Sequence, residues 1–321
     1  MTEQASLDGF RGKQVLITGG LGFLGSNLAI ALVGLGARVT LLDAMVDDHG
    51  GNLVNVEPIK NRVTVNFSDV RDESSLKYLV RGKDYVFHLA GQNDHVLSLT
   101  NPFPDIDINI KGSAILLETC RRFNAGARLV YSGTRGEYGR AVMLPVGEDQ
   151  PMHPRGIYEL SSLTAQQMFQ IYNDNHGIPS VTLRLTNIYG ERAQMKHSRF
   201  GVANWFIRLA LDDETIPVFG DGSLLRDFVY VQDAVDAMLR CAATEAAYGR
   251  SSTWAITAPP AFASWRRSSC AWPGAAAGSS RRSRRSAPPR TPATSAPTSA
   301  RSRGWWAGSR RPPWRTASGR P

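Results

Sequence analysis

The residues with the clearest capacity for chemistry form a glycine-rich segment near the N-terminus, TGGLGFLG (18–25). Gly19, Gly22 and Gly25 follow the β-branched run QVLIT and precede an apolar stretch that begins near Asn27. Glycines at this spacing permit a tight turn, let backbone N–H groups approach a pyrophosphate, and let a helix pack closely on a strand. The pattern predicts a dinucleotide-binding turn between a strand and a helix, although glycine-rich turns also close ordinary loops.

An acidic residue follows at the distance that such a site requires. Eighteen residues after Gly25, the β-branched run RVTLLD ends at Asp43, and no Arg follows it immediately. A carboxylate at this position accepts hydrogen bonds from an adenosine ribose diol and repels a 2′-phosphate. The sequence therefore favours NAD over NADP. The alternative interpretation is a solvated Asp at the end of a strand.

Two further segments fit the same site. Asp69 and Val70 follow a third β-branched run, where they are placed to hold an adenine ring. The strand pattern YVFHLAG (85–91) ends in small residues, which lets the chain pass close to a dinucleotide. Because His88 lies inside this buried pattern, we expect it to be a core residue rather than a catalyst.

The elements that must position these residues alternate along the chain. From about residue 13 to residue 256, short β-branched runs alternate with longer apolar-periodic stretches. This alternation predicts an α/β fold with a doubly wound, Rossmann-type parallel sheet. We expect residues 1–186 to form an NAD-binding domain and residues 187–257 to form a smaller, partial substrate lobe that caps the cleft. An aberrant tail, 258–321, is expected to truncate this lobe.

The composition of the chain changes after Ile256. No Ile, Val, Leu or Met occurs from residue 257 onward, whereas five of the seven Trp residues lie there. Ala, Arg, Pro, Ser and Gly make up most of the rest. We expect this tail to be an out-of-frame translation of a GC-rich gene, since such codons read in the wrong frame yield these residues. A disordered basic arm is the alternative.

The net charge of +9 belongs to the same tail. Residues 261–321 hold 13 Arg and no Lys, Asp or Glu, whereas residues 1–260 carry 24 basic and 28 acidic residues. The main body therefore gives no electrostatic reason to expect nucleic acid. No apolar run is long enough for a membrane span, and the N-terminus lacks the apolar core of a signal peptide. Three scattered cysteines argue against a disulfide framework or metal site, so we expect a cytoplasmic protein.

Six motifs, in this order, resemble those of the extended short-chain dehydrogenase/reductase family, in particular its NAD-dependent nucleotide-sugar epimerases and dehydratases. They are TGGLGFLG (18–25), HLAG (88–91), YSGTRGEYG (131–139), PRGIYELSS (154–162), LRLTNIYG (183–190) and FGDGSLLRDFVYVQD (219–233). The resemblance covers residues 12–257 and implies that NAD binds along the carboxyl edge of the sheet.

The resemblance also implies roles for individual positions. Thr134 corresponds to the Ser/Thr that hydrogen-bonds the reacting hydroxyl of the sugar, and Tyr158 to the tyrosine that removes the hydroxyl proton. Asn187 and Arg226 correspond to residues that hold the substrate diphosphate, for which a guanidinium is well suited. Without the resemblance, Asn187 would be expected to cap a turn and Arg226 to pair with Asp227.

The predicted cofactor-binding residues are Gly19, Gly22, Phe23, Leu24, Gly25, Asp43, Asp69, Val70, Leu89, Ala90, Gly91, Asn109, Ser132 and Tyr158. The predicted substrate-binding residues are Asn93, Thr134, Asn187, Val218, Phe219 and Arg226, of which Val218 and Phe219 lie near the base-binding wall. No metal site is expected.

Two departures from the family pattern bear on the chemistry. The family motif is Tyr-x-x-x-Lys, and Ser162 occupies the lysine position, where it cannot lower the pKa of the Tyr158 phenol by charge. The 4,6-dehydratases place an Asp-Glu pair directly after the threonine, where this chain has Arg135 and Gly136, and Glu137 follows one place late. The cysteine of the GDP-mannose 3,5-epimerases is absent from this loop.

These features favour an NAD-dependent nucleotide-sugar epimerase that acts by transient oxidation at C4 of a hexose or uronate. One alternative is a dehydratase or reductase of the same fold, and another is a catalytically impaired protein that binds NAD and a sugar nucleotide. Relatives dimerise through the helix that carries the tyrosine, so a homodimer through a four-helix bundle is expected. The sequence identifies neither the base nor the sugar.

Overall fold

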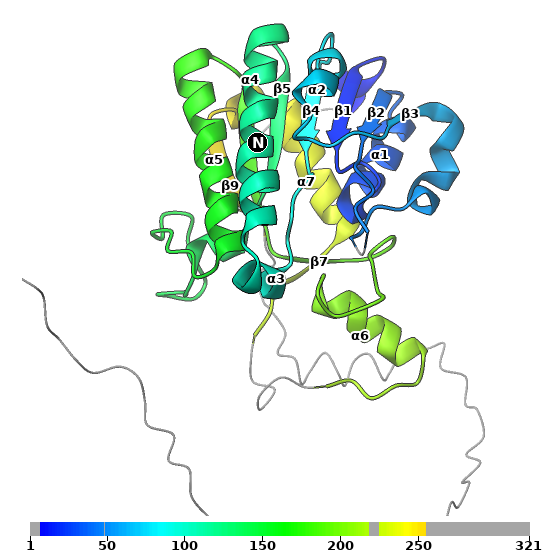
Figure 1. Ribbon diagram of the computed structural model, residues 1–321, viewed down its shortest axis with the longest axis vertical. Helices are drawn as coiled ribbons and strands as arrows, with labels where there is room; N and C mark the ends of the chain where they lie inside the picture. Colours follow the sequence, from blue (N-terminus) through cyan, green and yellow to red (C-terminus); the bar gives the residue numbers. More distant parts are fainter. Residues whose placement is uncertain (1–6, 48, 218–224, 255–321) are drawn as a thin grey trace, which may run out of the picture. The chain divides into compact units, whose positions relative to one another are not determined.

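A parallel sheet forms the centre of the described chain. The structure is a computed structural model and describes residues 7–47, 49–217 and 225–254. Its main sheet has seven strands in the order β3-β2-β1-β4-β5-β6-β9, and all neighbouring strands are parallel (Figure 1). They are β1 (Gln14–Thr18), β2 (Arg38–Leu42), β3 (Val63–Asn66), β4 (Tyr85–His88), β5 (Arg128–Thr134), β6 (Ser180–Leu185) and β9 (Arg250–Trp254). The order reverses between β1 and β4, so the sheet is doubly wound and the predicted Rossmann-type fold is confirmed.

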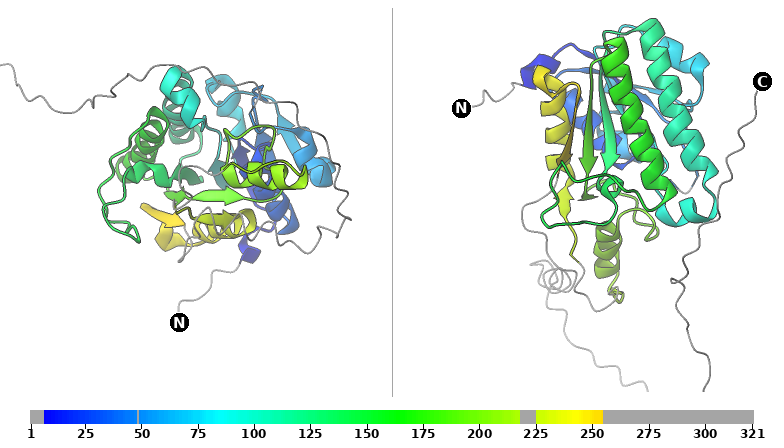
Figure 2. Two further views of the ribbon diagram at one scale, coloured as in Figure 1. Left: turned by 90° about the horizontal axis from the view of Figure 1, so that it is seen from below. Right: turned by 90° about the vertical axis from the view of Figure 1, so that its left-hand side faces the viewer.

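Helices cover both faces of this sheet, which explains why its strands are apolar on both sides. Val15 and Ile17 of β1 lie in one buried cluster with residues of α1 and α7, whereas Leu16 lies in a second cluster with residues of α2, α4 and α5. Figure 2 shows the sheet between these two helical layers. The covering helices are α1 (Phe23–Gly34), α7 (Val231–Ala243), α2 (Glu73–Leu79), α4 (Ser113–Phe123) and α5 (Ile157–His176).

Short helical segments fill several of the connections, and acidic side chains begin two of the helices. Asp72 accepts a hydrogen bond from the N–H of Ser74, and Asp94 accepts from two N–H groups at the start of α3. Such caps satisfy N–H groups that lack partners within the helix. The segments are η1 (Leu7–Phe10), η2 (Leu53–Arg62), α3 (His95–Thr100), the π-helical η3 (Asp105–Gly112), η4 (Arg135–Tyr138) and η5 (Glu245–Ala247).

A smaller lobe follows β6. It contains β7 (Asn187–Tyr189), α6 (Val202–Leu211) and β8 (Phe228–Tyr230), and β7 pairs with β8 in a separate two-stranded sheet. Its own buried cluster includes Phe206 and Phe228. After β8 the chain returns to the main domain, because α7 packs on the first face of the sheet and β9 pairs with β6. The stretch 187–257 therefore contributes to both parts, and the tail 258–321 lies outside the described residues.

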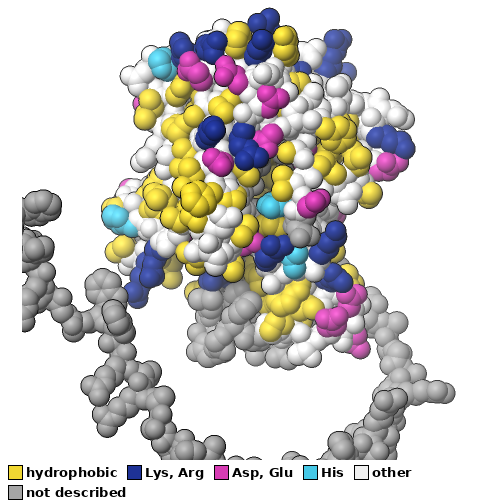
Figure 3. Space-filling view, in the orientation of Figure 1, with side chains coloured by type: hydrophobic (Ala, Val, Ile, Leu, Met, Phe, Trp, Pro, Cys, Tyr) yellow, Lys and Arg dark blue, Asp and Glu magenta, His cyan; other side chains and the backbone are white. Residues whose placement is uncertain are grey.

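Several large apolar side chains remain exposed on and beside α3, η3 and α5. Figure 3 shows hydrophobic side chains gathered on this face. The residues with large exposed fractions there are Val96, Leu99, Phe103, Ile106, Leu160 and Ile171. A search of the described residues for a helix able to cross a bilayer finds none.

The buried carboxyl of Asp105 makes the fold sensitive to pH. Asp105, on η3, is fully buried, and burial, with Asp94 and Glu159 adding repulsion, raises its pKa to about 6. Because the pKa of this carboxyl is higher in the folded protein than in the unfolded chain, the folded protein loses stability as the pH rises from about 4 to about 6. Above pH 6 the whole of this loss persists.

We therefore expect Asp105→Asn to raise the free energy of unfolding at pH 7.5 by about 1 kcal/mol, less than the shift implies because a buried amide also needs hydrogen-bond partners. The gain should vanish at pH 4, where the native carboxyl is neutral. Urea denaturation at both pH values measures it, with Asp107→Asn, an exposed neighbour on η3, as the control. An equal effect at both pH values would contradict the assignment of the effect to this carboxyl.

Candidate active site

A cavity of about 600 Å³ lies at the carboxyl ends of the central strands, where the strand order reverses. Ligands of doubly wound sheets bind at this point, because the loops after adjacent strands diverge there. The glycine turn after β1, the ends of β2, β4 and β5, and the first turn of α5 line the cavity, and segment 185–204 adds residues of the lobe. A recess of about 100 Å³ adjoins it, beside Tyr158 and Ser162.

The glycine turn is packed too closely for any other residue. A Cβ on Gly25 would lie 2.2 Å from the carbonyl oxygen of Gly19, and a Cβ on Gly19 would lie 2.8 Å from the backbone nitrogen of Ala90. Gly19 also has a φ of +70°. No side chain caps α1 at Gly22, so the first N–H groups of this helix remain available to a phosphate. Gly22 and the predicted contacts Phe23 and Leu24 all line the cavity.

Asp43 lies at the end of β2 and lines the cavity, as the NAD prediction requires. Its carboxylate also accepts hydrogen bonds from the backbone nitrogens of Leu21, at 3.0 Å, and Met45, at 2.9 Å. Asp43 thus fixes the glycine turn as well as presenting a negative charge beside it. Sequence reasoning did not foresee this second role.

The predicted adenine contacts Asp69 and Val70 also line the cavity. Arg71 holds the carboxylate of Asp69, with a distance of 2.7 Å from Arg71 Nη2 to Asp69 Oδ2. This hydrogen-bonded guanidinium keeps the pKa of Asp69 below its ordinary value. Asp69 is therefore ionised and oriented by Arg71.

The loop after β4 passes close to β1, as its small residues predict. The backbone nitrogen of Ala90 donates to Thr18 Oγ1, and Leu89, Ala90 and Gly91 all line the cavity. Asn109 binds this loop: its side-chain amide accepts from the nitrogen of Gln92 and donates to the carbonyl of Gln92 and to Ser161 Oγ. Its polar atoms are thus engaged with protein, and it lines only the smaller recess, whereas Asn93 and Ser132 line both spaces.

His88 is buried, as its strand pattern predicts. Its ring nitrogens lie 2.8 Å from Thr18 Oγ1 and 3.0 Å from Ser113 Oγ. Burial lowers the pKa of His88 to about 4, so the ring is neutral at physiological pH. His88 links β1, β4 and α4 and does not line the cavity.

Tyr158 and Thr134 come together at one end of the cavity. Tyr158 lies in the first turn of α5 and Thr134 ends β5, and the Thr134 hydroxyl is close enough to the phenol to affect its pKa. Burial raises the pKa of Tyr158 to about 12, and the neighbouring carboxylates of Glu137, Glu159 and Asp105 also favour the neutral phenol. At neutral pH the phenol therefore holds its proton. No lysine among the described residues lowers its pKa.

Ser162 contacts Glu137, which the sequence alone places only in the loop after Thr134. Its hydroxyl donates to Glu137 Oε1 at 2.8 Å, and the same oxygen accepts from the backbone nitrogen of Thr134 at 2.9 Å. Glu137 is fully buried and forms an ion pair with Arg184 of β6, at 3.3 Å from Oε2 to Nε. Glu137 therefore points into the interior beneath the loop and does not replace the missing acid of the dehydratases. The one sequence signal for this pair was the charge of Arg184 within the apolar strand pattern of β6.

The pairing of β7 with β8 brings two predicted substrate residues close in space. Asn187 Nδ2 donates to the backbone oxygen of Asp227 at 2.8 Å, next to Arg226. Burial and the nearby charge of Arg135 lower the pKa of Arg226. Val218 and Phe219, the predicted base contacts, lie outside the described residues.

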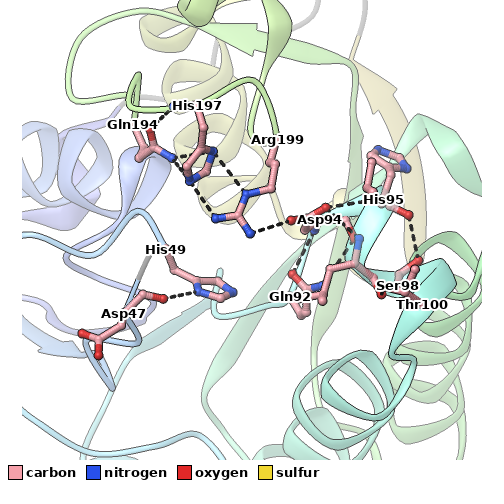
Figure 4. A network of polar contacts seen from close by, with 12 residues as sticks. Asp47, His49, Gln92, Asp94, His95, Ser98, Thr100, Gln194, His197 and Arg199 are labelled. Carbon is pink, nitrogen blue, oxygen red and sulfur yellow. Dashed lines mark hydrogen bonds and ion pairs between the residues drawn. The ribbon is translucent and has the colours of Figure 1, made fainter.

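A polar network joins the lobe to the loop after β4 across the cavity. Figure 4 shows Arg199 extending from the lobe toward Asp94, with 3.4 Å between Arg199 Nη1 and Asp94 Oδ2. His197 Nε2 lies 3.0 Å from Arg199 Nη2, and the ring of His49 packs on Phe200 with centroids 5.6 Å apart. Sequence reasoning did not single out this network. Within the described residues, no group of three or more His, Cys, Asp or Glu side chains could hold a metal ion.

Comparison with known proteins agrees with this geometry. Residues 15–256 match the model of the NAD dependent epimerase/dehydratase family. A putative UDP-glucose 4-epimerase of Methanocaldococcus jannaschii is 35% identical over 227 residues, which are 70% of this chain and 72% of the relative.

Two solved structures extend the comparison. One is a UDP-N-acetylglucosamine 4-epimerase from Methanobrevibacter ruminantium in complex with UDP-N-acetylmuramic acid (TM-score 0.74, 28% identity, 80% of this chain and 81% of that chain). The other is the UDP-glucose 4-epimerase of Thermus thermophilus in complex with NAD (TM-score 0.72, 26% identity, 80% and 82%). The chain belongs to the NAD-dependent epimerase/dehydratase family of extended short-chain dehydrogenases/reductases.

Proposed function

We propose that this protein is an NAD-dependent nucleotide-sugar epimerase that inverts C4 by transient oxidation. One observation carries the proposal: Thr134 and Tyr158 line the same cavity as the glycine turn and Asp43. A dinucleotide held by the turn would share this cavity with the two hydroxyl groups, which suits redox chemistry at a sugar hydroxyl. The Thermus thermophilus relative, whose structure contains NAD, supports the choice of cofactor.

The residues of the turn fit this cofactor. The space that a Cβ would fill at Gly19 and Gly25 is taken by backbone, so N–H groups reach a pyrophosphate directly. The Asp43 carboxylate is positioned to accept from the ribose diol, and Asp69 and Val70 line the adenosine end. When bound, NAD supplies the acceptor and donor of the hydride at C4.

Side chains of the protein would transfer the proton of the C4 hydroxyl. Thr134 and Tyr158 would hold the C4 hydroxyl. Tyr158, in the small fraction of molecules in which it is a phenolate, would accept the hydroxyl proton during oxidation and return it after the 4-keto sugar has rotated in the site. Asn187 and Arg226 hold the diphosphate, so the substrate stays bound while its ring rotates. Because the pKa of Tyr158 is about 12, proton removal is slow without a cation nearby.

The geometry favours an epimerase over a dehydratase of the same family. Water elimination needs a further acid and base beside the threonine, where this chain has Arg135 and Gly136, and the carboxylate of Glu137 is buried and paired with Arg184. A dehydratase would accumulate a 4-keto product with ultraviolet absorbance, and an epimerase would not. The second alternative, a protein that binds but does not turn over a sugar nucleotide, is favoured by Ser162 and by the expected replacement of the end of the lobe by the tail 258–321.

We further propose that two copies of the chain associate through α4 and α5 in a four-helix bundle. The exposed apolar side chains near these helices, such as Leu160 and Ile171, support this arrangement, because soluble monomers seldom expose such clusters.

One prediction of the proposed function concerns the choice between NAD and NADP. Asp43→Ala should weaken NAD binding by about 1–3 kcal/mol, the scale of lost charge-assisted hydrogen bonds, and should narrow the preference for NAD over NADP. Calorimetric titration of the apoprotein measures both constants, with Asp47→Ala, an exposed residue after the same strand, as the control. Equal affinity of the unmodified protein for NAD and NADP would show that Asp43 does not read the ribose.

Another prediction concerns the effect of a lysine at position 162 on turnover. A lysine there can stabilise the Tyr158 phenolate, and each unit by which a pKa falls corresponds to about 1.4 kcal/mol. Ser162→Lys should therefore raise epimerase turnover at least about tenfold on the correct sugar nucleotide. Tyr158→Phe in the same background should abolish the gain.

A coupled assay on a panel of sugar nucleotides measures this turnover. Gln167→Lys, which adds the same charge at an exposed position of α5, is the control and should change nothing. If the NAD-loaded Ser162→Lys protein turns over no faster than the unmodified protein, the non-catalytic binding protein becomes the better account.

A further inference from the structure

Two exposed arginines lie at the Tyr158 end of the cavity. Arg135 and Arg155 both line the cavity, and neither forms a hydrogen bond or ion pair with any residue in the described ranges. The carboxylates that face the same end are already engaged. Glu159 Oε1 lies 2.7 Å from His95 Nδ1, and Asp94 Oδ2 lies 3.4 Å from Arg199 Nη1. The wall therefore presents an excess of positive charge to whatever fills this end.

The position of Arg135 is defined by its neighbours. It follows Thr134 directly in the chain and begins η4. Its charge acts on Glu159 at the start of α5, and on Arg226 and Asp227 just before β8. Arg135 thus lines the cavity directly after Thr134 in the chain, and its charge is felt at α5 and at the start of β8.

The position of Arg135 indicates which part of a bound sugar it would contact. In the proposed reaction Thr134 and Tyr158 hold the C4 hydroxyl, and the diphosphate is attached at C1, on the opposite side of the sugar ring. A guanidinium beside Thr134 therefore meets the substituents next to C4, of which C6 is the one that can carry a charge. The guanidinium groups of Arg135 and Arg155 are both exposed to solvent, so their charge is free to pair with an anionic ligand group through charge-assisted hydrogen bonds.

We propose that the substrate is a nucleotide-diphosphate uronate whose C6 carboxylate binds Arg135, with Arg155 adding a second positive charge. A guanidinium and a carboxylate can form two parallel hydrogen bonds, which a neutral hydroxymethyl group cannot match. The inference rests on the proposed function and narrows its substrate class. The competing source of negative charge is the diphosphate itself, which every nucleotide sugar carries.

The experiment compares ligands that differ only at C6. Calorimetric titration of the NAD-loaded protein with UDP-glucuronate, UDP-glucose and UDP separates the carboxylate from the diphosphate, and dTDP-glucuronate, dTDP-glucose and dTDP repeat the comparison with another base. We expect the uronate to bind at least tenfold more tightly than the matched glucose. Arg135→Gln should remove this preference by weakening the uronate alone, and Arg155→Gln should reduce it at least threefold.

Arg140→Gln is the matched control, because Arg140 lies in the same loop, is exposed and does not line the cavity. It should leave all affinities within twofold. Equal affinity for uronate and glucose, or an Arg135→Gln variant that weakens UDP, UDP-glucose and UDP-glucuronate by the same factor, overturns the inference but leaves the proposed function standing. If no sugar nucleotide of either set binds, the proposed function fails as well.

Discussion

The site depends on how closely three backbone segments approach one another at the end of β1. The turn after β1, the first turn of α1 and the chain leaving β4 meet with no room for a Cβ at Gly19 or Gly25. This approach places the uncapped N–H groups of α1 and the Asp43 carboxylate around one space. It also brings the loop after β4 within hydrogen-bonding distance of Thr18, and that loop lines the path toward Tyr158. A larger residue at either glycine would separate these segments and dismantle the cofactor end of the cavity.

The charges along the cavity divide it into two chemically different ends. Asp43 and Asp69 lie at the end beside the glycine turn, where Arg71 pairs with Asp69 and the Asp43 carboxylate is the acidic group proposed to bind a ribose diol. At the Tyr158 end, Arg135 and Arg155 form no ion pair, whereas the carboxylates of Glu159 and Asp94 are paired with His95 and Arg199. Beneath that end, the buried Glu137–Arg184 pair holds both Thr134 and Ser162, so the loop that carries the reacting groups is anchored to β6. In the proposed function, this anchored loop would be a fixed platform for the sugar, between the dinucleotide and the two arginines.

The sequence predicts the main sheet well, because β-branched runs and glycine spacing are local signals of strands and turns. Asp43, His88, Thr134 and Tyr158 lie where their strand and helix patterns place them. Contacts between distant segments could not be read in this way. The Glu137–Arg184 pair and the Arg199–Asp94 contact join residues far apart in the chain, and only the folded arrangement shows that they meet. Likewise, the return of α7 and β9 to the main sheet follows from packing that no short motif encodes.

The central claim is that this cavity inverts a sugar carbon by removing and returning the same hydride. The most direct measurement uses a sugar nucleotide that carries deuterium at C4, incubated in ordinary water with the NAD-loaded protein. Mass spectrometry and proton NMR then report the configuration of C4 and its deuterium content. The account predicts a mixture of both C4 epimers in which the deuterium remains at C4. Epimers that have lost the deuterium to solvent would contradict it.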